Sequence, residues 1–142
     1  FSRTQFHNSS RKNMHKSVGA IIRKDGKFLL MDRNIQPFGY AGIAGHIDKG
    51  ETPEEALKRE VKEESGLKVT SDSQMLEQFI DWNICSKGTK GHYWFLYNCE
   101  VSGDLKPSER EAKSMDWYTR EEIGNLKLEP VWEYWFKKLG VI

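Results

Sequence analysis

The sequence predicts an α/β fold in which a mixed β-sheet is covered by helices on both faces. Three observations lead to this prediction. An amphipathic helix is expected near the middle of the chain, between two pairs of apolar, strand-like segments. A second amphipathic helix, rich in tryptophan, is expected close to the C-terminus. The chain has 142 residues, 37% of them hydrophobic, which is enough for one domain with its own core. Helices placed between and after strand pairs are typical of a sheet packed between helices.

The chain is expected to begin with a polar, basic segment and then to form a single domain. Residues 1–16 contain no acidic residue, and we expect them to be a tail or an edge segment that rests on the core. The domain is expected in residues 17–142. Its first strand is predicted at residues 17–23, which form an apolar run rich in valine and isoleucine.

A β-hairpin is predicted next. Asp25 and Gly26 are typical of a tight hairpin turn, so the returning strand is predicted at residues 28–33. Arg33 stands at the end of this strand, where the chain enters a loop at residues 34–42.

Two aromatic residues, Phe38 and Tyr40, lie in that loop, and a glycine-rich turn is predicted after it at residues 45–50. Because many acidic residues follow directly, one interpretation is that the two aromatics form a wall of a substrate site. The other interpretation is that they cap the hydrophobic core. The residues themselves leave both interpretations open.

The central helix is predicted at residues 53–65, between a strong start signal and a strong stop signal. Thr52 is a typical N-cap, Pro53 suits the first helical position, and Glu55 completes a capping box with Thr52. Gly66 can adopt the left-handed conformation that commonly ends a helix.

The acidic residues of this helix are concentrated beside its apolar face. At roughly 100° per residue, one half of the helix carries Ala56, Leu57, Glu60, Val61, Glu63 and Glu64. The other half carries Glu54, Glu55, Lys58, Lys62 and Ser65. Carboxylates at the edge of a packed face need a cation or a metal as a partner, because an unpaired buried charge is costly. A solvated charged helix is the alternative, but the lysines fall on the opposite side.

The second half of the chain is predicted to contain further strands and two helices. A short strand that ends in a turn is expected at residues 67–72. Further strands are expected at residues 74–85, 92–101 and 115–118, with a hairpin turn at 86–91 and a polar loop at 102–114. A short helix is expected at residues 119–126, where Thr119 and Glu122 form a capping box. The last helix, at residues 130–140, places Trp132, Trp135, Phe136 and Leu139 on one face that should pack on the core.

Composition excludes several classes of protein. The net charge of +1 gives no basic footprint, so a nucleic acid partner is not expected. No apolar run approaches the roughly 20 residues that span a bilayer, so no membrane partner is expected. Cys85 and Cys99 lie in predicted strands, without the cysteine or histidine spacing of a zinc site, and are expected to be reduced core thiols. We found no secretory signal and expect a cytoplasmic protein.

The carboxylates of the central helix indicate a site for a hard divalent cation. Acids spaced by three and four residues present oxygen atoms on one helical face, which suits Mg²⁺ or Mn²⁺ better than zinc. Such an ion binds substrate phosphates and lowers the pKa of a water, whose proton a nearby carboxylate can accept. These groups suit attack of water on a phosphorus of a diphosphate link. The spacing of an EF-hand is absent, and the two acids of a glycosidase usually come from separate elements.

The central stretch resembles the complete Nudix box. Gly45 is followed after five residues by Glu51, and after seven more by REVKEESGL at residues 59–67. The resemblance extends to the order of predicted strands from about residue 17 to the C-terminus. It implies a Nudix-type α/β/α sandwich with a mixed β-sheet. It also implies divalent-metal-dependent hydrolysis of a diphosphate linkage in a nucleoside diphosphate derivative, with Mg²⁺ as the cofactor and Mn²⁺ as an alternative.

The same resemblance implies roles for individual residues. Metal ligands would be Glu60, Glu63 and Glu64, and Glu60 would share in activating the water. Arg59 and Glu51 would form a pair that orients the carboxylates.

Further roles implied by the resemblance lie outside the helix. A backbone carbonyl of Ala44 or Gly45 would also reach the metal. Glu111, which precedes Trp117 by six residues, is the acid outside the box that best completes the site, with Glu109 as the second choice. Arg33 would contact phosphate.

Three points remain open at this level. The turn reads Ala44-Gly45-His46 where many relatives have two glycines, and a lone histidine such as His46 is usually structural. A nucleotide-binding module without turnover, or an isoprenoid-diphosphate isomerase, would use the same fold. The isomerase needs a protonating cysteine, and neither cysteine lies in a convincing loop.

A nucleotide-type small molecule is the expected substrate and a homodimer is possible. Candidate base or sugar contacts are Phe38, Tyr40, Trp82, Asn83, His92 and Tyr93.

Overall fold

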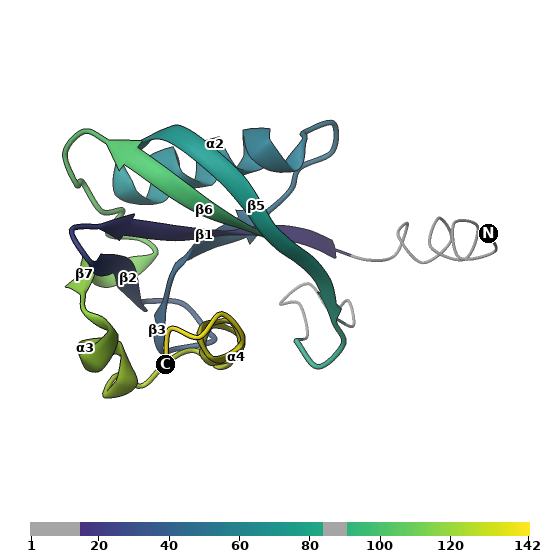
Figure 1. The fold of residues 1–142 in the computed structure, drawn as a ribbon. Coiled ribbons are helices and arrows are strands. Elements are labelled where there is room, and N and C mark those ends of the chain that lie inside the picture. Colours follow the sequence, from purple (N-terminus) through teal and green to yellow (C-terminus); the bar gives the residue numbers. More distant parts are fainter. Residues whose placement is uncertain (1–14, 84–90) are drawn as a thin grey trace.

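The computed structural model describes residues 15–83 and 91–142. A mixed sheet lies between two helical layers, with α2 (Pro53–Ser65) on one face and α3 (Arg120–Gly124) and α4 (Pro130–Lys138) on the other (Figure 1). The strands are β1 (His15–Lys24), β2 (Lys27–Arg33), β3 (Tyr40–Ala41), β4 (Ile43–His46), β5 (Lys68–Ile80), β6 (His92–Ser102) and β7 (Ala112–Tyr118). The predicted α/β/α sandwich with a mixed sheet is confirmed.

Strand β1 is the centre of the sheet. Along one edge it pairs in parallel with β6, and along the other it pairs antiparallel first with β4 and then with β2. The register places His15 opposite His92 and Ser17 opposite His46. As a result, residues that are far apart in the sequence meet at the end of the sheet where β1 and β6 begin and β4 ends.

The local signals for the first hairpin and the central helix are confirmed. Asp25 and Gly26 both have positive φ angles, of 52° and 76°, which is the backbone of a tight hairpin turn. Helix α2 has the predicted bounds. The Thr52 side chain accepts a hydrogen bond from the backbone N–H of Glu55, and the Glu55 side chain accepts one from the N–H of Thr52. Gly66 ends the helix in the left-handed conformation, with φ 76°.

Four details of the prediction are wrong. The turn predicted near residue 72 does not form, because β5 continues along β6 as an edge strand and absorbs its polar residues through two register shifts. This strand ends at Ile80, well before Cys85, which lies outside the described residues together with most of the predicted turn at 86–91. Gly45 and His46 belong to β4, not to a turn. The first strand begins at His15, so the expected boundary at residue 16 falls inside β1.

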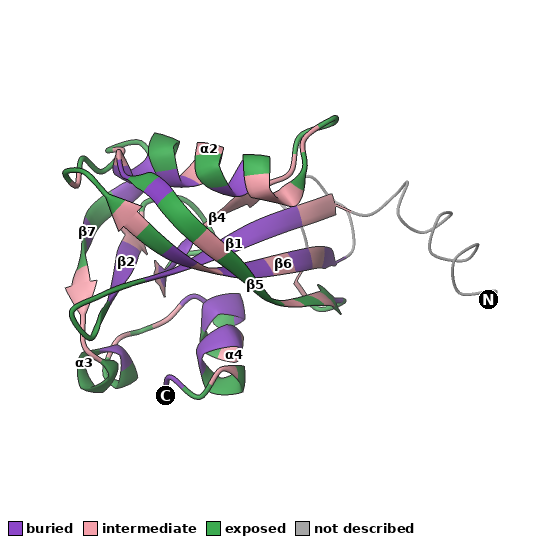
Figure 2. Ribbon diagram, turned by 45° about the horizontal axis from the view of Figure 1, so that its top comes forward, coloured by how far each residue is buried: buried purple, intermediate pink, exposed green. Residues whose placement is uncertain are grey.

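The core consists of two clusters, one with residues of α2 and the other with residues of α3 and α4. Figure 2 shows buried positions in the strands between these helices. Under α2, the residues Ala56, Leu57 and Val61 are fully buried, as the helical wheel predicts. Ser65, predicted on the solvent side, is also buried. Its hydroxyl donates to the carbonyl of Val61 at 2.6 Å, so the polar group is satisfied inside the core.

On the opposite face, α4 buries the predicted aromatic stripe. Trp132, Trp135 and Phe136 are each at most 1% exposed, and a fully buried side chain of this size contributes about 1.5–3 kcal/mol. Trp132 lies against the backbone of the sheet. A Cβ atom added to Gly42 would come within 2.6 Å of its ring, and one added to Gly19 within 3.3 Å. None of the helices in residues 15–83 and 91–142 is long and apolar enough to cross a membrane.

Candidate active site

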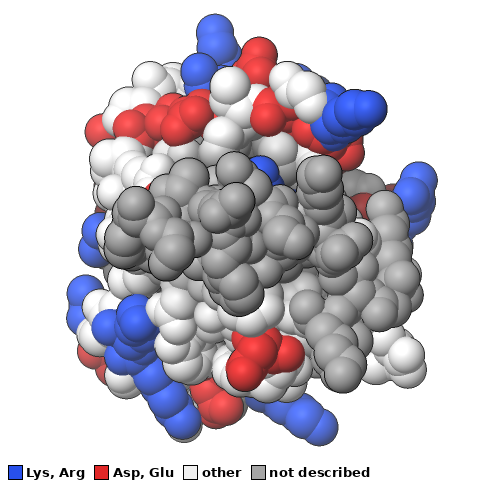
Figure 3. Space-filling model, turned by 90° about the vertical axis from the view of Figure 1, so that its right-hand side faces the viewer, with Lys and Arg blue, Asp and Glu red and all other residues white. Residues whose placement is uncertain are grey.

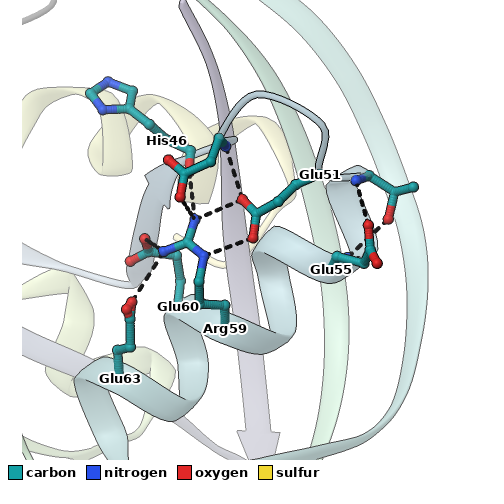
Figure 4. Close-up of polar contacts among 8 residues, drawn as sticks. His46, Glu51, Glu55, Arg59, Glu60 and Glu63 are labelled. Atoms are coloured by element: carbon teal, nitrogen blue, oxygen red, sulfur yellow. Dashed lines mark hydrogen bonds and ion pairs between the residues drawn. The ribbon is translucent and has the colours of Figure 1, made fainter.

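The guanidinium of Arg59 is the centre of a polar network on the exposed side of α2 (Figure 4). It makes a two-pronged ion pair with Glu51, from Nε to Oε2 at 2.8 Å and from Nη2 to Oε1 at 2.9 Å. Its Nη1 atom donates to Glu60 at 2.7 Å and to Glu63 at 3.1 Å. Its Nη2 atom also donates to the backbone carbonyl of His46 at 3.0 Å. The predicted contact between Arg59 and Glu51 therefore forms, and it joins the helix to strand β4.

Glu51 also organises the loop that precedes the helix. Its Oε1 atom accepts a hydrogen bond from the backbone N–H of Asp48 at 2.8 Å. The hydrogen bond from Arg59, with that from Asp48, lowers the pKa of Glu51 to about 2. The same contact with Glu51 raises the pKa of Arg59. Both groups are therefore charged at any physiological pH, and the loop is tied to α2 by charge-assisted hydrogen bonds.

A second set of acids lies deeper, where Glu64 is the central residue. Glu64 is 3% exposed, and its Oε2 atom is buried without a hydrogen-bond partner among the described residues. Burial raises the pKa of Glu64, and the neighbouring carboxylates of Glu60 and Glu111 raise it further. Burial also raises the pKa of Glu60, although Arg59 opposes this effect. Three carboxylates around one unpaired buried oxygen form the kind of oxygen-rich site that a hard divalent cation would occupy.

The loop after β6 explains why Glu111, and not Glu109, reaches this cluster. Two backbone N–H groups of the loop, from Lys106 and Ser108, donate to the last carbonyls of α2 at 2.7 and 2.9 Å. These bonds fix the loop against the end of the helix, and Glu111 then lies beside Glu64. Glu109 stays exposed. The sequence favoured Glu111 in this pair only weakly, because the path of the loop depends on contacts between distant residues.

Strand β4 passes directly over the carboxylate of Glu60. A Cβ atom added to Gly45 would lie 2.1 Å from Cδ of Glu60, a distance that no real side chain could occupy. Glycine at this position therefore lets the backbone contact the acidic cluster. This close approach is compatible with the predicted role of a Gly45 carbonyl as a metal ligand, which stays a prediction.

The acidic cluster forms one wall of a pocket with a volume of about 430 Å³. This size lies within the range typical of small-molecule sites. The pocket is lined by residues from both ends of the sequence, among them Arg33, Gly45, Glu60, Asn83, His92, Trp94, Glu111, Glu129 and Trp132. It therefore lies between the acids of α2 and the aromatic face of α4.

Arg33 lines the pocket, and its guanidinium hydrogen-bonds to carbonyls of its own loop. Its Nε atom donates to the carbonyls of Pro37 at 2.8 Å and Ile35 at 3.2 Å. These bonds hold residues 35–37 as part of the pocket wall. The predicted phosphate contact of Arg33 remains a prediction, and the structure adds a role for Arg33 in shaping the loop.

Phe38 and Tyr40 are not among the residues that line the pocket. Phe38 is 54% exposed, and the Lys113 ammonium lies 5.4 Å from the centre of its ring. Tyr40 belongs to β3 and packs edge-on against Tyr118 at 5.8 Å. The loop turns between them at Gly39, whose φ angle is 128°, so the segment before the two aromatics supplies the wall.

Alternation along the strands separates the other candidate contacts. Asn83 and His92 line the pocket, and the Nδ1 atom of His92 lies 2.8 Å from the Asn83 carbonyl. Tyr93 points to the opposite face of β6, where its hydroxyl donates to Glu77. Trp82 is half-exposed and packs edge-on against Tyr134. Of these four candidates, Asn83 and His92 are the two that line the pocket.

Two features of the pocket were missed from the sequence. Glu129 is 5% exposed, caps the N-terminus of α4 through the N–H of Trp132, and lines the pocket. Burial raises its pKa. Its position before Pro130 could have identified it as a helix cap. The other feature is a group of three histidines, His15, His46 and His92, which only the strand register brings together.

Comparisons with known proteins define the class of this domain. The NUDIX domain model matches residues 13–139. The chain is 49% identical over 115 residues to the ADP-ribose pyrophosphatase of Methanocaldococcus jannaschii, a match that covers 80% of this chain and 66% of that protein. It is 32% identical over 108 residues to the NAD-capped RNA hydrolase NUDT12 of Pongo abelii, covering 72% of this chain. A crystal structure of a MutT protein from Methanosarcina mazei matches with a TM-score of 0.69 and 24% identity, over 84% of this chain and 86% of that one.

This chain belongs to the NUDIX domain family, which confirms the resemblance read from the Nudix box. The match to the Methanosarcina structure supports the likeness of fold alone, because the sequence identity is low. The chain spans about a fifth of the length of NUDT12, since the match covers 21% of that protein. The predicted enzyme class, a Nudix hydrolase, agrees with the names of these relatives, which describe hydrolases and a pyrophosphatase.

Proposed function

We propose that this domain hydrolyses a diphosphate linkage in a nucleoside diphosphate derivative, with Mg²⁺ as the cofactor and Mn²⁺ as a substitute. The observation that carries the proposal is the buried, unpaired Oε2 atom of Glu64, set among Glu60 and Glu111 at the wall of a pocket of about 430 Å³. Such a cluster is unfavourable without a cation. A pocket of this size can hold a nucleotide. A diphosphate bound there would bring its negative charge to the same ion.

The donor set of the site fits a hard divalent ion. Glu60, Glu64 and Glu111 would hold it, together with the Gly45 carbonyl. Such an ion, when bound, screens the charge of phosphate groups and lowers the pKa of a coordinated water. The carboxylate of Glu63 is half-exposed and bonded to Arg59, so its predicted role as a ligand requires it to turn away from that partner.

Proton transfer, positioning and nucleoside binding are proposed for different residues of the site. Glu60, which lies beside Glu64 and lines the pocket, is the base that accepts a proton from the attacking water. Arg59 is a positioning residue, because its Nη1 atom holds Glu60 at 2.7 Å while Glu51 holds its other edge. This bracing fixes the carboxylate before substrate arrives, which reduces the cost of orienting it in the transition state. The ring of Trp94, on the pocket wall, offers apolar surface to the nucleoside.

ADP-ribose is the first substrate to test. The relative from Methanocaldococcus jannaschii, 49% identical over the aligned region, is named for that activity. The net charge of +1 also favours a small molecule over a long nucleic acid. On the face shown in Figure 3, acidic and basic side chains of the described residues are interspersed. A panel should include ADP-ribose, nucleotide sugars and nucleoside triphosphates, because loops outside the Nudix box set the choice among them.

The proposal is tested by following product formation on this panel with Mg²⁺, and again after removal of the metal with a chelator. Glu60→Gln and Glu64→Gln should abolish most turnover. Glu109→Gln is the matched control, because this acid is exposed in the same loop as Glu111 and should leave the rate unchanged. Absence of turnover on every compound, with nucleotide still bound, would favour the non-catalytic binding module and contradict the proposal.

The structure offers no support for an isoprenoid-diphosphate isomerase. Cys99 is 2% exposed in β6, and burial raises its pKa to about 12, so its thiol is a core group. Cys85 lies outside the described residues. A homodimer, predicted from the resemblance, remains a prediction that sedimentation velocity would test.

A further inference from the structure

Three histidines from three strands meet at one end of the sheet. His15 begins β1, His46 ends β4 and His92 begins β6. One ring nitrogen of each lies within 4.8 Å of those of the other two. The rings of His46 and His92 are stacked, while His15 meets both of them edge-on. The pairing of β1 with β4 and β6 fixes this arrangement, so it is a property of the folded sheet and not of flexible side chains alone.

The distances fit a tetrahedral ion. With metal–nitrogen bonds of about 2.0–2.1 Å, two imidazole ligands of tetrahedral zinc lie about 3.4 Å apart. The Nε2 atoms of His46 and His92 are 3.4 Å apart. The ligand nitrogen of His15 lies within 4.8 Å of both. The difference from the tetrahedral spacing is at most about 1.4 Å (4.8 − 3.4 Å). Because His15 is only half-buried at the start of its strand, a side-chain rotation can close this gap.

The hydrogen bond of His92 leaves its metal-facing nitrogen available. Its Nδ1 atom lies 2.8 Å from the backbone carbonyl of Asn83. A carbonyl can only accept, so Nδ1 carries the proton, and in the neutral ring Nε2 has a lone pair. This lone pair faces Nε2 of His46 at 3.4 Å, in a hydrogen bond that a bound metal ion would replace. A histidine that binds a metal usually donates its other ring N–H to a carbonyl or carboxylate, which orients the imidazole in this way. This contact is independent of the distances within the cluster.

We propose that His15, His46 and His92 bind a Zn²⁺ ion at the wall of the pocket, in a site separate from the acidic cluster. Three imidazoles suit zinc and related transition metals, whereas the carboxylates of α2 suit Mg²⁺. Three protein ligands leave the fourth position for water or a ligand atom, as in zinc sites that are not purely structural. Since His46 and His92 both line the pocket, that position is accessible to a bound molecule.

The two sites share one residue through different atoms. The backbone carbonyl of His46 accepts from Arg59, while its imidazole belongs to the histidine cluster. An alanine at this position removes the imidazole and keeps the carbonyl. The substitution therefore separates the zinc site from the Arg59 network.

The test is a zinc titration of the metal-free protein in excess Mg²⁺, read with a chromophoric zinc indicator. Wild-type protein should bind one equivalent of Zn²⁺. His15→Ala and His46→Ala should each weaken binding on the order of tenfold or more, since even the partners of metal ligands act on this scale. His7→Ala is the matched control, because it removes the fourth histidine of the chain, and it should leave the affinity unchanged. Cobalt substitution should give the intense visible absorption of a tetrahedral nitrogen site.

Several results would overturn the proposal. These are absence of zinc binding by the wild type, full affinity in both histidine variants, or loss of affinity in His7→Ala. A loss of zinc binding in Glu64→Gln, with the histidines intact, would assign the ion to the acidic cluster instead. Circular dichroism spectra identical to wild type are required of each variant, and His15→Ala at the edge of the fold is the least disruptive of them. None of these readouts depends on turnover.

Discussion

Two polar clusters lie at the same end of the sheet and differ in how the sequence builds them. The acidic cluster takes nearly all its residues from one continuous stretch, from Asp48 to Glu64, and adds only Glu111 from elsewhere. The histidine cluster takes one residue from each of three strands. The first is visible as a spacing pattern, because a loop and one helix position every group. The second appears only when strand pairing is known, so no spacing rule could reveal it.

The comparison separates what each cluster is expected to do. The acidic cluster should carry the chemistry, while the histidine cluster should bind a different metal at its border. If this division holds, changes in the acids will reduce the rate and spare zinc binding. The predictions below are ordered from the largest expected effect to the smallest.

Glu64→Gln should reduce turnover by about 100-fold or more, because it removes a proposed ligand of the catalytic ion. The fold should be retained, and the thermal midpoint of the metal-free protein should stay close to wild type. Burial and the neighbouring acids already favour the neutral form of Glu64, and the glutamine amide has nearly the same shape. Steady-state kinetics and thermal denaturation provide the measurements. A rate and a metal affinity equal to wild type would show that Glu64 is not a ligand.

Arg59→Ala should lower both activity and stability, because Glu51 and Glu60 lose their common partner. The guanidinium is 29% exposed, so the free energy of unfolding should fall by only about 1–2 kcal/mol. Arg59→Lys keeps the charge but cannot form the two-pronged pair, and it should recover part of the stability and little of the rate. Activity near wild type in Arg59→Ala would exclude the positioning role.

Gly45→Ala should reduce activity more than stability. The new methyl group would displace the Glu60 carboxylate, which lies 2.1 Å from the added carbon, and overpacking of this kind costs about 1–3 kcal/mol. Gly124→Ala is the control, because nothing lies within 4 Å of its added carbon. The measurements are kcat and chemical denaturation. Equal kcat and equal stability of the two variants would mean that the backbone of β4 can shift at Gly45 without displacing Glu60.

The ion pair of Glu51 should make stability depend on pH in the acidic range. Its pKa falls from 4.5 to about 2 in the folded chain, so the unfolded chain binds the proton more readily. The contribution of the pair is therefore complete above pH 4.5 and disappears as the pH falls towards 2. The thermal midpoints of wild type and Glu51→Gln should converge between pH 5 and pH 2.5. A constant difference over this range would contradict the assignment.

Phe38→Ala should have the smallest effect. The ring is exposed and lies outside the pocket, so KM should change by less than about twofold and the fold should be unaffected. Trp94→Leu, on the pocket wall, is the comparison variant and should raise KM clearly. A large increase in KM for Phe38→Ala would instead support the interpretation that Phe38 forms a wall of the substrate site.

Local signals allowed much of the fold to be predicted. Thr52 and Gly66 defined both ends of α2, and Asp25 with Gly26 defined the first hairpin, because capping and turn geometry depend on neighbouring residues. Polar residues near Asp72 suggested a turn, but an exposed edge strand tolerates the same residues. Ser65 was assigned to solvent because a wheel cannot show that its hydroxyl would bond to the helix backbone.

The candidate site divides in the same way. Glu60, Glu63 and Glu64 could be grouped from their helical spacing, and the resemblance to the Nudix box added Arg59 and Glu51. Glu129 and the three histidines could not, because their proximity is created by the docking of α4 and by the register of β1. For Phe38 and Tyr40 the sequence left two interpretations open. Neither residue lines the pocket in this structure, and their role as substrate contacts stays a prediction.

The close packing of Trp132 against Gly19 and Gly42 has a consequence for the evolution of this pocket. A side chain at Gly42 or Gly19 would press on the indole ring, so neither position can gain bulk without displacing it. Divergence towards a new substrate is therefore expected at the rim, in residues 33–37 and at Asn83. The Trp132 side of the pocket can thus be the same for different substrates, while the rim residues determine which substrate binds.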